Sequence, residues 1–362
     1  MGGPGSYLSG EEERKHVLEV IESGYLSRYG TTENMAFKQK VHTFERRFAE
    51  HVGAKHALAV NSGTSAIMAS LVAIGVRPGD EVLVPGYTFI ASMSAVIAVG
   101  ARPVLVEIND SLTMDPDDFR AKIGPKAVIP VHMLGNPCDM ERINGVARKH
   151  NVKVLEDACQ AVGGSFKGRR LGTWGHMGAF SFNIYKVINA GDAGLLVTDH
   201  TNYFERAFAF HDQGHRPFRQ GVEVGNRNVI GINLRMNELT GAFLLGQLEK
   251  IDFILRTLRE KKARLKEAII EGLGAQADRL SFRKINDPGE CATLLTMIFP
   301  TRDEALRVAG ELSTKTLDQS GWHVYNNMEH LVAYRDPDGS PVIRRNELPK
   351  TDDILSRSVN LS

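Results

Sequence analysis

"HALAVNSGTSAIMASLVAIG", residues 56–75, contains a short apolar strand, a turn of small polar residues and an apolar helix that ends at Gly75. Further strand patterns follow, with helix patterns between them, at residues 80–85, 101–108, 126–133 and 152–158. Continuous apolar strands that alternate with helices are typical of a mostly parallel sheet covered by helices on both faces. The sequence therefore predicts an α/β fold, in which ligands lie at the carboxyl ends of the strands.

The length of 362 residues favours more than one domain. An acidic helix pattern covers about residues 10–24, and a long or broken helix pattern over 236–273 leaves the first domain. We expect an N-terminal arm and helix over 1–25, a large domain over 26–250 and a small C-terminal α/β domain over 251–362. The last segment, 334–362, is turn-rich and has no closing helix pattern.

Composition limits the partners. Lysine and arginine number 44 and aspartate and glutamate 43, so no net field attracts nucleic acid or anionic membranes. No apolar run approaches the roughly 18 residues of a membrane helix. The three cysteines lie far apart, which indicates neither a disulfide framework nor a metal site. We expect a cytoplasmic protein that binds no metal, no nucleic acid and no membrane.

The turn "NSGTSA" lies between a strand and a helix. The backbone N–H groups of Gly63, Thr64 and Ser65 can point outward at the amino end of that helix, where they would bind a phosphate. Serine and threonine in such a turn can also simply cap the helix. Both interpretations stay open on the sequence alone.

Two carboxylates end the strand pattern "VKVLED". Because side chains alternate along a strand, Glu156 and Asp157 point to opposite sides, and one can face a ligand while the other meets a structural partner. We assign Asp157 to the ligand, where it could hold a protonated ring nitrogen; capping the next segment is the alternative role.

A single lysine, Lys186, lies in "SFNIYKVINAGDAG", between an aromatic-rich run and a glycine-containing turn. A phosphate on the 62–65 turn and a cationic ring nitrogen on Asp157 describe a phosphorylated pyridine, and its aldehyde requires an amine. Lysine supplies that amine in proteins that bind pyridoxal phosphate. The alternative is a solvated surface lysine, which the apolar flanking residues disfavour.

Several stretches together resemble the sugar aminotransferases of the DegT/DnrJ/StrS family, which are fold type I enzymes that use pyridoxal 5′-phosphate. They run in the family's order over the first two-thirds of the chain, and they include "SGTSA" (62–66), "GDEVLVPGYTFIAS" (79–92), "EDACQAVGGSFKG" (156–168), "FSFNIYK" (180–186) and "GINLRMNE" (231–238). The resemblance implies a large domain with a central sheet between helices and a smaller C-terminal domain that lacks the family's usual last helix.

The resemblance also implies the roles of the site residues. Lys186 would be the Schiff-base lysine, and Asp157 would bind the pyridine nitrogen. The other implied contacts are Phe89 with the ring face, Gln160 with the ring hydroxyl, Ser62, Gly63, Thr64, Ser65 and Ser181 with the phosphate, and Asn233 with the phosphate of the neighbouring subunit. A homodimer with two shared active sites is therefore expected. In place of the family's common "GEGG" the chain has "GDAG", so Ala193 puts the path of that turn in question.

The activity implied is transamination, because Lys186 stands where some members have a histidine and dehydrate. Glutamate is the expected donor, pyridoxamine 5′-phosphate the intermediate and a keto- or aldehydo-sugar the acceptor. The C-terminal stretches most resemble the branch that makes 8-amino-3,8-dideoxy-manno-octulosonate. The alternatives are a nucleotide-sugar aminotransferase, an isomerase or dehydratase, and a binding protein without turnover.

Two weaker signals lie in a glycine-containing segment. His211 and His215 have the spacing of a helical zinc pair, but Gly214 between them disfavours a continuous helix. Arg216 and Arg219 could meet an anionic sugar or a donor carboxylate, although exposed loop arginines are the commoner case. Neither pair belongs to the predicted catalytic set.

Overall fold

The computed structural model describes residues 2–30, 34–122, 124–217 and 229–361. Its contacts group the chain into two compact units. The first unit comprises Met1–Arg77, Leu155–Gly163 and Arg169–Ile254, and the second comprises Pro78–Val154, Gly164–Gly168 and Leu255–Ser362. The domain boundaries expected from the sequence, near residues 25 and 250, stay a prediction.

A seven-stranded sheet has the order β1-β9-β8-β5-β4-β2-β3. Its strands are β1 (His56–Val60), β2 (Glu81–Pro85), β3 (Arg102–Val106), β4 (Ala127–Val128), β5 (Lys153–Asp157), β8 (Met177–Ser181) and β9 (Gly194–Thr198). Strand β9 runs antiparallel to both of its neighbours, whereas the pairs from β8 to β3 are parallel. The prediction of a mostly parallel sheet is therefore confirmed.

Strand β4 is much shorter than its apolar pattern over 126–133 suggests. It pairs with β2 and β5 only at Ala127 and Val128. The N–H of Ile129 still bonds to the carbonyl of Leu83, at 2.8 Å. The next residue, Pro130, has no N–H with which to continue the ladder, so the strand ends there.

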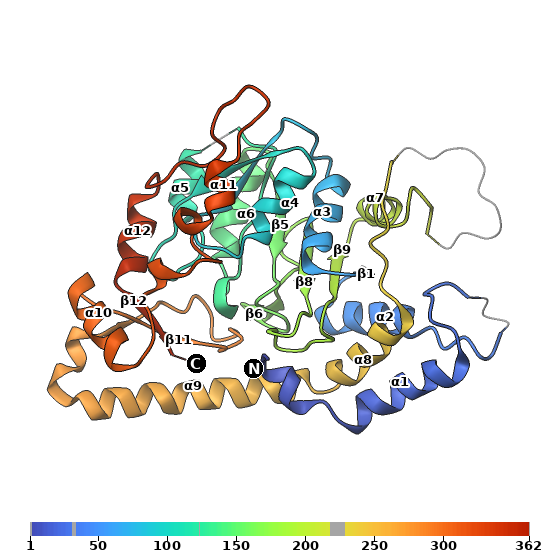
Figure 1. Cartoon of the computed structure of the whole chain (residues 1–362), viewed down its shortest axis with the longest axis horizontal. Coiled ribbons are helices and arrows are strands. Elements are labelled where there is room, and N and C mark those ends of the chain that lie inside the picture. Colours follow the sequence, from blue (N-terminus) through green and yellow to red (C-terminus); the bar gives the residue numbers. More distant parts are fainter. Residues whose placement is uncertain (1, 31–33, 123, 218–228, 362) are drawn as a thin grey trace. The chain divides into compact units, whose positions relative to one another are not determined.

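The helices that precede α9 among the described residues of the first unit are labelled in Figure 1. They are α1 (Glu11–Ser23), α2 (Lys40–Val52), α3 (Gly63–Ala73), α7 (Thr201–His211) and α8 (Glu238–Leu248). Helix α2 packs two fully buried phenylalanines, Phe44 and Phe48, against β8 and the residue after it. The ring centroids of Phe48 and Phe180 lie 5.0 Å apart, edge to face, and those of Phe44 and Phe182 lie 5.5 Å apart.

The second unit holds further helices and a three-stranded antiparallel sheet of order β10-β11-β12. The helices are α4 (Ala91–Ala98), α5 (Pro116–Ala121), α6 (Met140–Lys149), α10 (Arg302–Glu311), α11 (Glu329–Ala333) and α12 (Pro349–Ser356). The strands of this sheet are β10 (Ser281–Phe282), β11 (Leu295–Ile298) and β12 (Ser358–Leu361). The short strand β6 (Ser165–Phe166) also belongs to the second unit, and β7 (Arg169–Arg170) belongs to the first unit.

The C-terminal segment differs from the turn-rich tail that we expected. It contains α12 and β12, and β12 pairs with β11. The carboxylate of Glu107 accepts bonds from the N–H of Lys350, at 3.2 Å, and from the N–H and hydroxyl of Thr351, at 2.8 and 2.6 Å. These charge-assisted bonds cap the first turn of a helix whose sequence pattern is weak.

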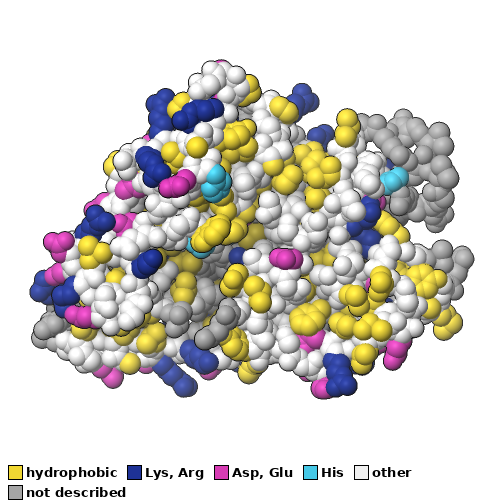
Figure 2. Space-filling model, viewed as in Figure 1, with side chains coloured by type: hydrophobic (Ala, Val, Ile, Leu, Met, Phe, Trp, Pro, Cys, Tyr) yellow, Lys and Arg dark blue, Asp and Glu magenta, His cyan; other side chains and the backbone are white. Residues whose placement is uncertain are grey.

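The helix pattern over 236–273, expected to be one long helix or a broken one, corresponds to two separate helices. Helix α8 ends at Leu248, and α9 (Ile251–Leu273) follows after two residues. None of the described helices is long and apolar enough to cross a membrane. On the face shown in Figure 2, basic and acidic side chains are interspersed, which agrees with the near-zero net charge.

A buried polar network supports strand β1 in the first unit. The guanidinium of Arg28 bonds to both carboxylate oxygens of Glu45, at 2.9 and 3.1 Å, and to the carbonyl of Ala59, at 3.2 Å. His211 is fully buried beside it, with Nδ1 2.6 Å from the carbonyl of Phe208 and Nε2 3.4 Å from Arg28. The Nδ1–H therefore donates to the carbonyl, and Nε2 can accept from the guanidinium as a neutral ring.

We predict that this network makes stability depend on pH. Burial, reinforced by Arg28, lowers the pKa of His211 to about 4, from 6.5. The unfolded chain therefore binds a proton on this histidine near pH 6.5, whereas the folded chain binds it only near pH 4. Between these two pH values the free energy of unfolding falls as the pH drops, by about 3 kcal/mol in total. Denaturant unfolding at several pH values should show this slope in the wild type.

The slope should be smaller in His211→Gln, because glutamine does not titrate. The matched control is His330→Gln, since His330 is an exposed histidine outside this network. It should keep the wild-type slope. An unchanged slope in His211→Gln would contradict the assignment of the pH dependence to this buried ring.

Candidate active site

The turn at the carboxyl end of β1 forms the amino end of α3. The hydroxyl of Ser62 accepts the N–H of Ser65, at 3.1 Å, and the hydroxyl of Ser65 donates to Asn61, at 2.6 Å. Among the described residues, no group accepts the N–H of Gly63 or Thr64. The capping interpretation is therefore confirmed, and anion binding by the two remaining first-turn amides stays a prediction.

This turn lies against the starts and ends of other strands. A Cβ atom built on Gly63 would lie 2.7 Å from the Cβ of Ser181 and 3.0 Å from the sulfur of Cys159. A Cβ atom built on Gly194, the first residue of β9, would lie 2.1 Å from the carbonyl oxygen of Ser62. Two glycines thus allow the predicted phosphate residues at 62–65 and 181 to lie together, and the roles of Gly194 and Cys159 had no signal in the sequence analysis.

Of the two carboxylates at the end of β5, Glu156 takes the structural role, whereas ligand binding by Asp157 stays a prediction. Glu156 is fully buried and accepts the N–H groups of Gly172, at 2.8 Å, and Gly175, at 2.6 Å, so it is the structural partner of a loop. Asp157 is 4% exposed, and its Oδ1 accepts the N–H of Cys159 at 3.1 Å. Asp157 therefore closes a short turn at the carboxyl edge of the sheet, and it shares that edge with the 62–65 turn.

The charges that act on the Cys159 thiol indicate that Lys186 lies near Asp157. The pKa of the Cys159 thiol is raised well above its ordinary value, first by burial and then by the Asp157 carboxylate, whereas the Lys186 ammonium opposes the rise. One thiol thus senses both charges. Lys186 is partly buried in a turn, where its N–H bonds to the carbonyl of Asn183 at 3.0 Å. The structure therefore brings Asp157 and Lys186 to one region.

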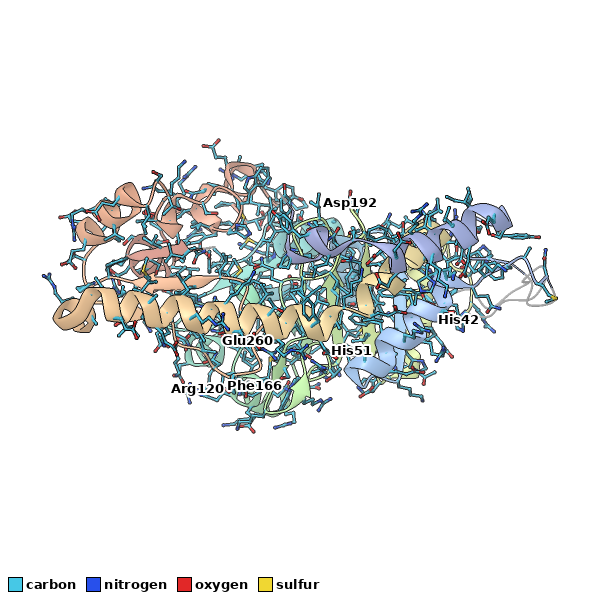
Figure 3. All side chains as sticks on the ribbon, turned by 90° about the horizontal axis from the view of Figure 1, so that it is seen from below. His42, His51, Arg120, Phe166, Asp192 and Glu260 are labelled. Carbon is cyan, nitrogen blue, oxygen red and sulfur yellow. The ribbon has the colours of Figure 1, made fainter. Side chains whose placement is uncertain are left out.

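Ala193 has an ordinary backbone conformation in the turn after Lys186. The positive φ of that turn, 84°, falls on Gly191, and Ala193 is not among the described residues with a positive φ. The carbonyl of Ala193 accepts the N–H of Phe182 at 2.8 Å. Asp192, labelled in Figure 3, is exposed. Alanine is therefore compatible with this turn because glycine's conformational freedom is required two residues earlier.

The remaining predicted residues stay predictions. Gln160 lies in the turn after Asp157, and Asn233 is exposed, with its Oδ1 accepting the N–H of Arg235 at 3.1 Å. Phe89 belongs to the second unit, where its ring centroid lies 5.6 Å from that of His323.

The two weaker signals gain no support. Helix α7 ends at His211, so no helix continues to His215. Among the described residues, no cluster of histidine, cysteine and carboxylate side chains could hold a metal ion. Arg216 is exposed, and Arg219 lies outside the described residues.

The arrangement fits a phosphorylated pyridine aldehyde. It combines two first-turn amides for a phosphate, a nearly buried carboxylate for a ring nitrogen and a lysine amine for an aldehyde. All three belong to the first unit. Gly63, which is buried and has no side chain, allows the turn to lie directly against Ser181.

A model of the DegT/DnrJ/EryC1/StrS aminotransferase family matches residues 8–362. The chain belongs to this family. The resemblance predicted from the motifs is therefore confirmed, and with it fold type I, the aminotransferase class at the level of the family, and pyridoxal 5′-phosphate as the family's cofactor.

Curated relatives with similar sequences support the same family. The chain is 39% identical over 244 residues to the GDP-perosamine synthase of Caulobacter vibrioides. The matched region covers 66% of this chain and 62% of that protein. It is 35% identical over 316 residues to the spore coat polysaccharide biosynthesis protein SpsC of Bacillus subtilis, 82% and 79% of the two chains. The matches to three GDP-perosamine synthases cover less than two thirds of those proteins, 62%, 66% and 65%.

The matches to solved structures cover a larger share of both chains than the matches to the perosamine synthases. The aminotransferase from Psychrobacter cryohalolentis superposes with a TM-score of 0.82 at 26% identity, over 98% of this chain and 92% of that chain. A 3-amino-5-hydroxybenzoic acid synthase superposes with a TM-score of 0.79 at 28% identity, over 98% and 91%.

In this member of the family, an N-terminal arm of residues 2–8 lies on the lysine turn. The N–H of Gly3 bonds to the carbonyl of Ile184 at 2.7 Å, and the side-chain amide of Asn189 donates to the hydroxyl of Ser6 at 3.1 Å. A Cβ atom on Gly3 would lie 2.5 Å from the carbonyl oxygen of Lys186. The arm therefore contacts the backbone of the lysine itself.

A buried chain of hydrogen bonds anchors both the arm and the turn. The amide oxygen of Gln247 accepts the N–H of Asn189 at 3.3 Å, and its Nε2 donates to Glu13 at 2.8 Å. Glu13 in turn accepts Lys250 at 2.7 Å. Gln247 is fully buried and Glu13 is 2% exposed, so both need these partners.

We predict that Gly194→Ala weakens cofactor binding. The new methyl group would collide with the carbonyl of Ser62, so the 62–65 turn must shift. The N–H groups of Gly63 and Thr64 would then no longer point toward the predicted phosphate position. Fluorescence titration with pyridoxal 5′-phosphate should show a higher Kd. The matched control is Gly145→Ala in α6, where a Cβ meets nothing within 4 Å. Equal Kd values for the two variants would contradict this close approach.

We predict that Gln247→Leu loosens the lysine turn. Leucine leaves the buried N–H of Asn189 without its acceptor, which costs about 1–3 kcal/mol of local stability. Hydrogen exchange followed by mass spectrometry should show faster exchange in peptides that span 184–190. Gln319→Leu, at an exposed position, is the control and should leave these peptides unchanged. Wild-type exchange in Gln247→Leu would mean that the buried chain does not hold the turn.

Proposed function

We propose that this chain catalyses transfer of an amino group from an amino acid, with glutamate as the donor, to a keto- or aldehydo-sugar. The observation behind the proposal is that Asp157 and Lys186 both act on Cys159, beside the open amides of Gly63 and Thr64. Family membership and the names of two relatives, a perosamine synthase and a spore coat polysaccharide protein, support an amino-sugar product.

When bound, pyridoxal 5′-phosphate supplies an electron sink that allows an amino group to leave the donor. Lys186 would hold it covalently and, when free, would carry a proton from and to the donor's α-carbon as general base and acid. Asp157 would keep the ring nitrogen protonated through a charge-assisted bond. The amides of Gly63 and Thr64, with Ser181, would orient the phosphate.

The acceptor is proposed as a nucleotide-linked sugar, because three relatives are named GDP-perosamine synthase. This choice differs from the octulosonate product expected from the C-terminal stretches, which stays a sequence prediction. A panel of both sugar classes, followed by product mass, would separate the two.

We further propose a cytoplasmic homodimer with shared active sites. Large apolar side chains beside Lys186 are exposed, including Ile184 at 46%, Tyr185 at 70% and Tyr7 at 66%. A second subunit would cover them, and the exposed Asn233 would reach its phosphate group. Light scattering should give the mass of two chains.

The lysine assignment is tested by borohydride reduction and peptide mass. Wild-type protein incubated with pyridoxal 5′-phosphate should carry the reduced cofactor on the peptide of Lys186, and Lys186→Ala should not. Lys149→Ala is the control, because this residue is an exposed helix lysine. Lys186→Ala should also lower the rate of amino transfer by about 10²–10⁴ or more, as expected when the general acid and base is lost.

Product analysis separates the alternative functions. A transaminase forms 2-oxoglutarate from glutamate in equal amount to amino sugar. A protein that binds the cofactor but never changes its absorption with any amino donor would be a binding protein. Conversion of sugar without 2-oxoglutarate would indicate an isomerase or dehydratase.

A further inference from the structure

A second polar site lies in the second unit. It is a pocket of about 270 Å³ between α9 and the segment that carries β10 and β11, here called the α9 pocket. Six of its lining residues are used below: Arg259, Lys262, Lys266, Phe282, Arg283 and Glu290. Figure 3 shows α9 along its length, with Glu260 labelled beside this stretch.

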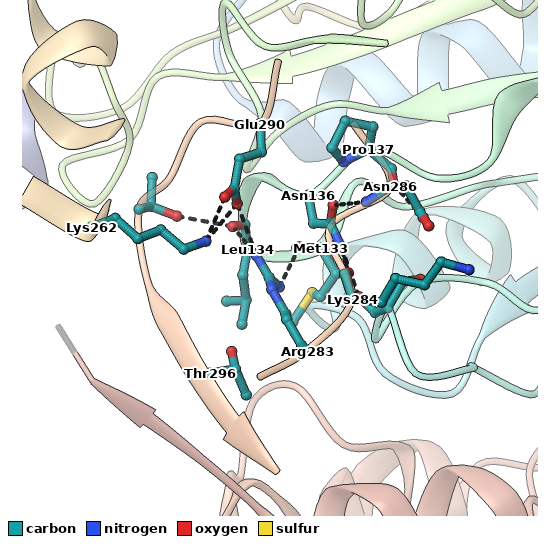
Figure 4. Close-up of polar contacts among 12 residues, drawn as sticks. Met133, Leu134, Asn136, Pro137, Lys262, Arg283, Lys284, Asn286, Glu290 and Thr296 are labelled. Carbon is teal, nitrogen blue, oxygen red and sulfur yellow. Dashed lines mark hydrogen bonds and ion pairs between the residues drawn. The ribbon is translucent and has the colours of Figure 1, made fainter. Parts of the chain in front are cut away.

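Arg283 lies at the base of the pocket, with its side chain 1% exposed. Its two terminal nitrogens bond to the carbonyls of Met133, at 3.1 Å, and Leu134, at 3.0 Å. Figure 4 shows the guanidinium between these carbonyls and the Glu290 carboxylate, which lies 3.7 Å away. The Nε of Arg283 is buried and has no hydrogen-bond partner among the described residues.

Lys262 approaches the same carboxylate from α9. Its ammonium bonds to the two oxygens of Glu290 at 2.6 and 2.7 Å, and its side chain is 12% exposed (Figure 4). Burial lowers the pKa of Lys262, the Glu290 carboxylate opposes this, and the nearby Arg283 guanidinium adds to the lowering. Two nearly buried cations thus share one carboxylate.

Two more cations extend the positive wall. Arg259 bonds through Nε to the carbonyl of Glu290, at 2.8 Å, and through a terminal nitrogen to that of Gly289, at 3.0 Å. The Lys266 ammonium lies 5.0 Å from the ring centroid of Phe282. Carbonyls and a ring hold these groups in place without neutralising their charge.

The charge balance of the pocket is therefore positive. Arg259, Lys262, Lys266 and Arg283 bring four positive charges and Glu290 brings one negative charge, so the sum is +3 among the lining residues. Lys262 and Arg283 are nearly buried and face a single carboxylate, whereas Lys266 is exposed. Buried charge without full compensation is costly, and a concave site lined by one sign of charge attracts counter-ions. The volume lies below the roughly 300–1,000 Å³ of drug-sized ligand sites, so a small ion fits better than a sugar nucleotide.

We propose that the α9 pocket is a binding site for a small oxyanion, a phosphate or a carboxylate. The anion would balance Lys262 and Arg283 and give the buried Nε–H of Arg283 an acceptor. This proposal does not depend on the function proposed above.

The test is anion binding to the full chain loaded with pyridoxal 5′-phosphate, so that the 62–65 turn does not compete. Inorganic phosphate and malonate are titrated separately, at constant ionic strength set with chloride, and followed by thermal shift and by calorimetry. We expect a saturable rise in Tm. Lys262→Gln should weaken the apparent affinity about tenfold or more, as the loss of one charge-assisted hydrogen bond predicts.

The matched control is Lys261→Gln, which removes an exposed charge one residue away on the same helix and should keep wild-type affinity. Binding of phosphate, of malonate or of both would support the site and identify which oxyanion it takes. A Tm that follows ionic strength alone, or equal affinities in Lys262→Gln and wild type, would overturn the proposal.

Discussion

The close approach of β9 to the 62–65 turn is the constraint on which the rest of the site depends. Gly194 pairs with Val60 on one side and with Ser181 on the other, so the strand joins the helix-capping turn to the strand that leads to Lys186. A side chain at this position would separate them. Strand β9, which has no side chain at its first residue, lies between β1 and β8 and lets the 62–65 turn approach Ser181.

Local patterns were enough to predict most elements and part of the site. The apolar runs at 56–60 and 153–157 and the helices that follow the 62–65 and 138–139 turns lie where their periodicity indicated, since each depends on neighbours in the sequence. Alternation of side chains along a strand indicated that one of the two carboxylates would have a structural partner, which is Glu156. The family's motifs added the identity of the cofactor, which no periodicity contains.

Features that depend on distant partners could not be predicted in this way. The bond from Gln247 to Glu13 joins residues 234 positions apart, and Arg283 reaches the carbonyl of Met133 across 150 positions. A buried glutamine or arginine looks like any surface residue until its partner is known. The helix at 349–356 was missed for the same reason, because its first turn is capped by Glu107, far upstream.

The N-terminal arm has a consequence for how the protein is made. Ser6 contacts Ile184 across 178 residues, and the buried chain that supports both includes Lys250. Contacts so far apart carry a large loop-closure entropy and form late. A nascent chain on the ribosome therefore leaves this set of arm contacts incomplete until the polypeptide beyond Lys250 has emerged.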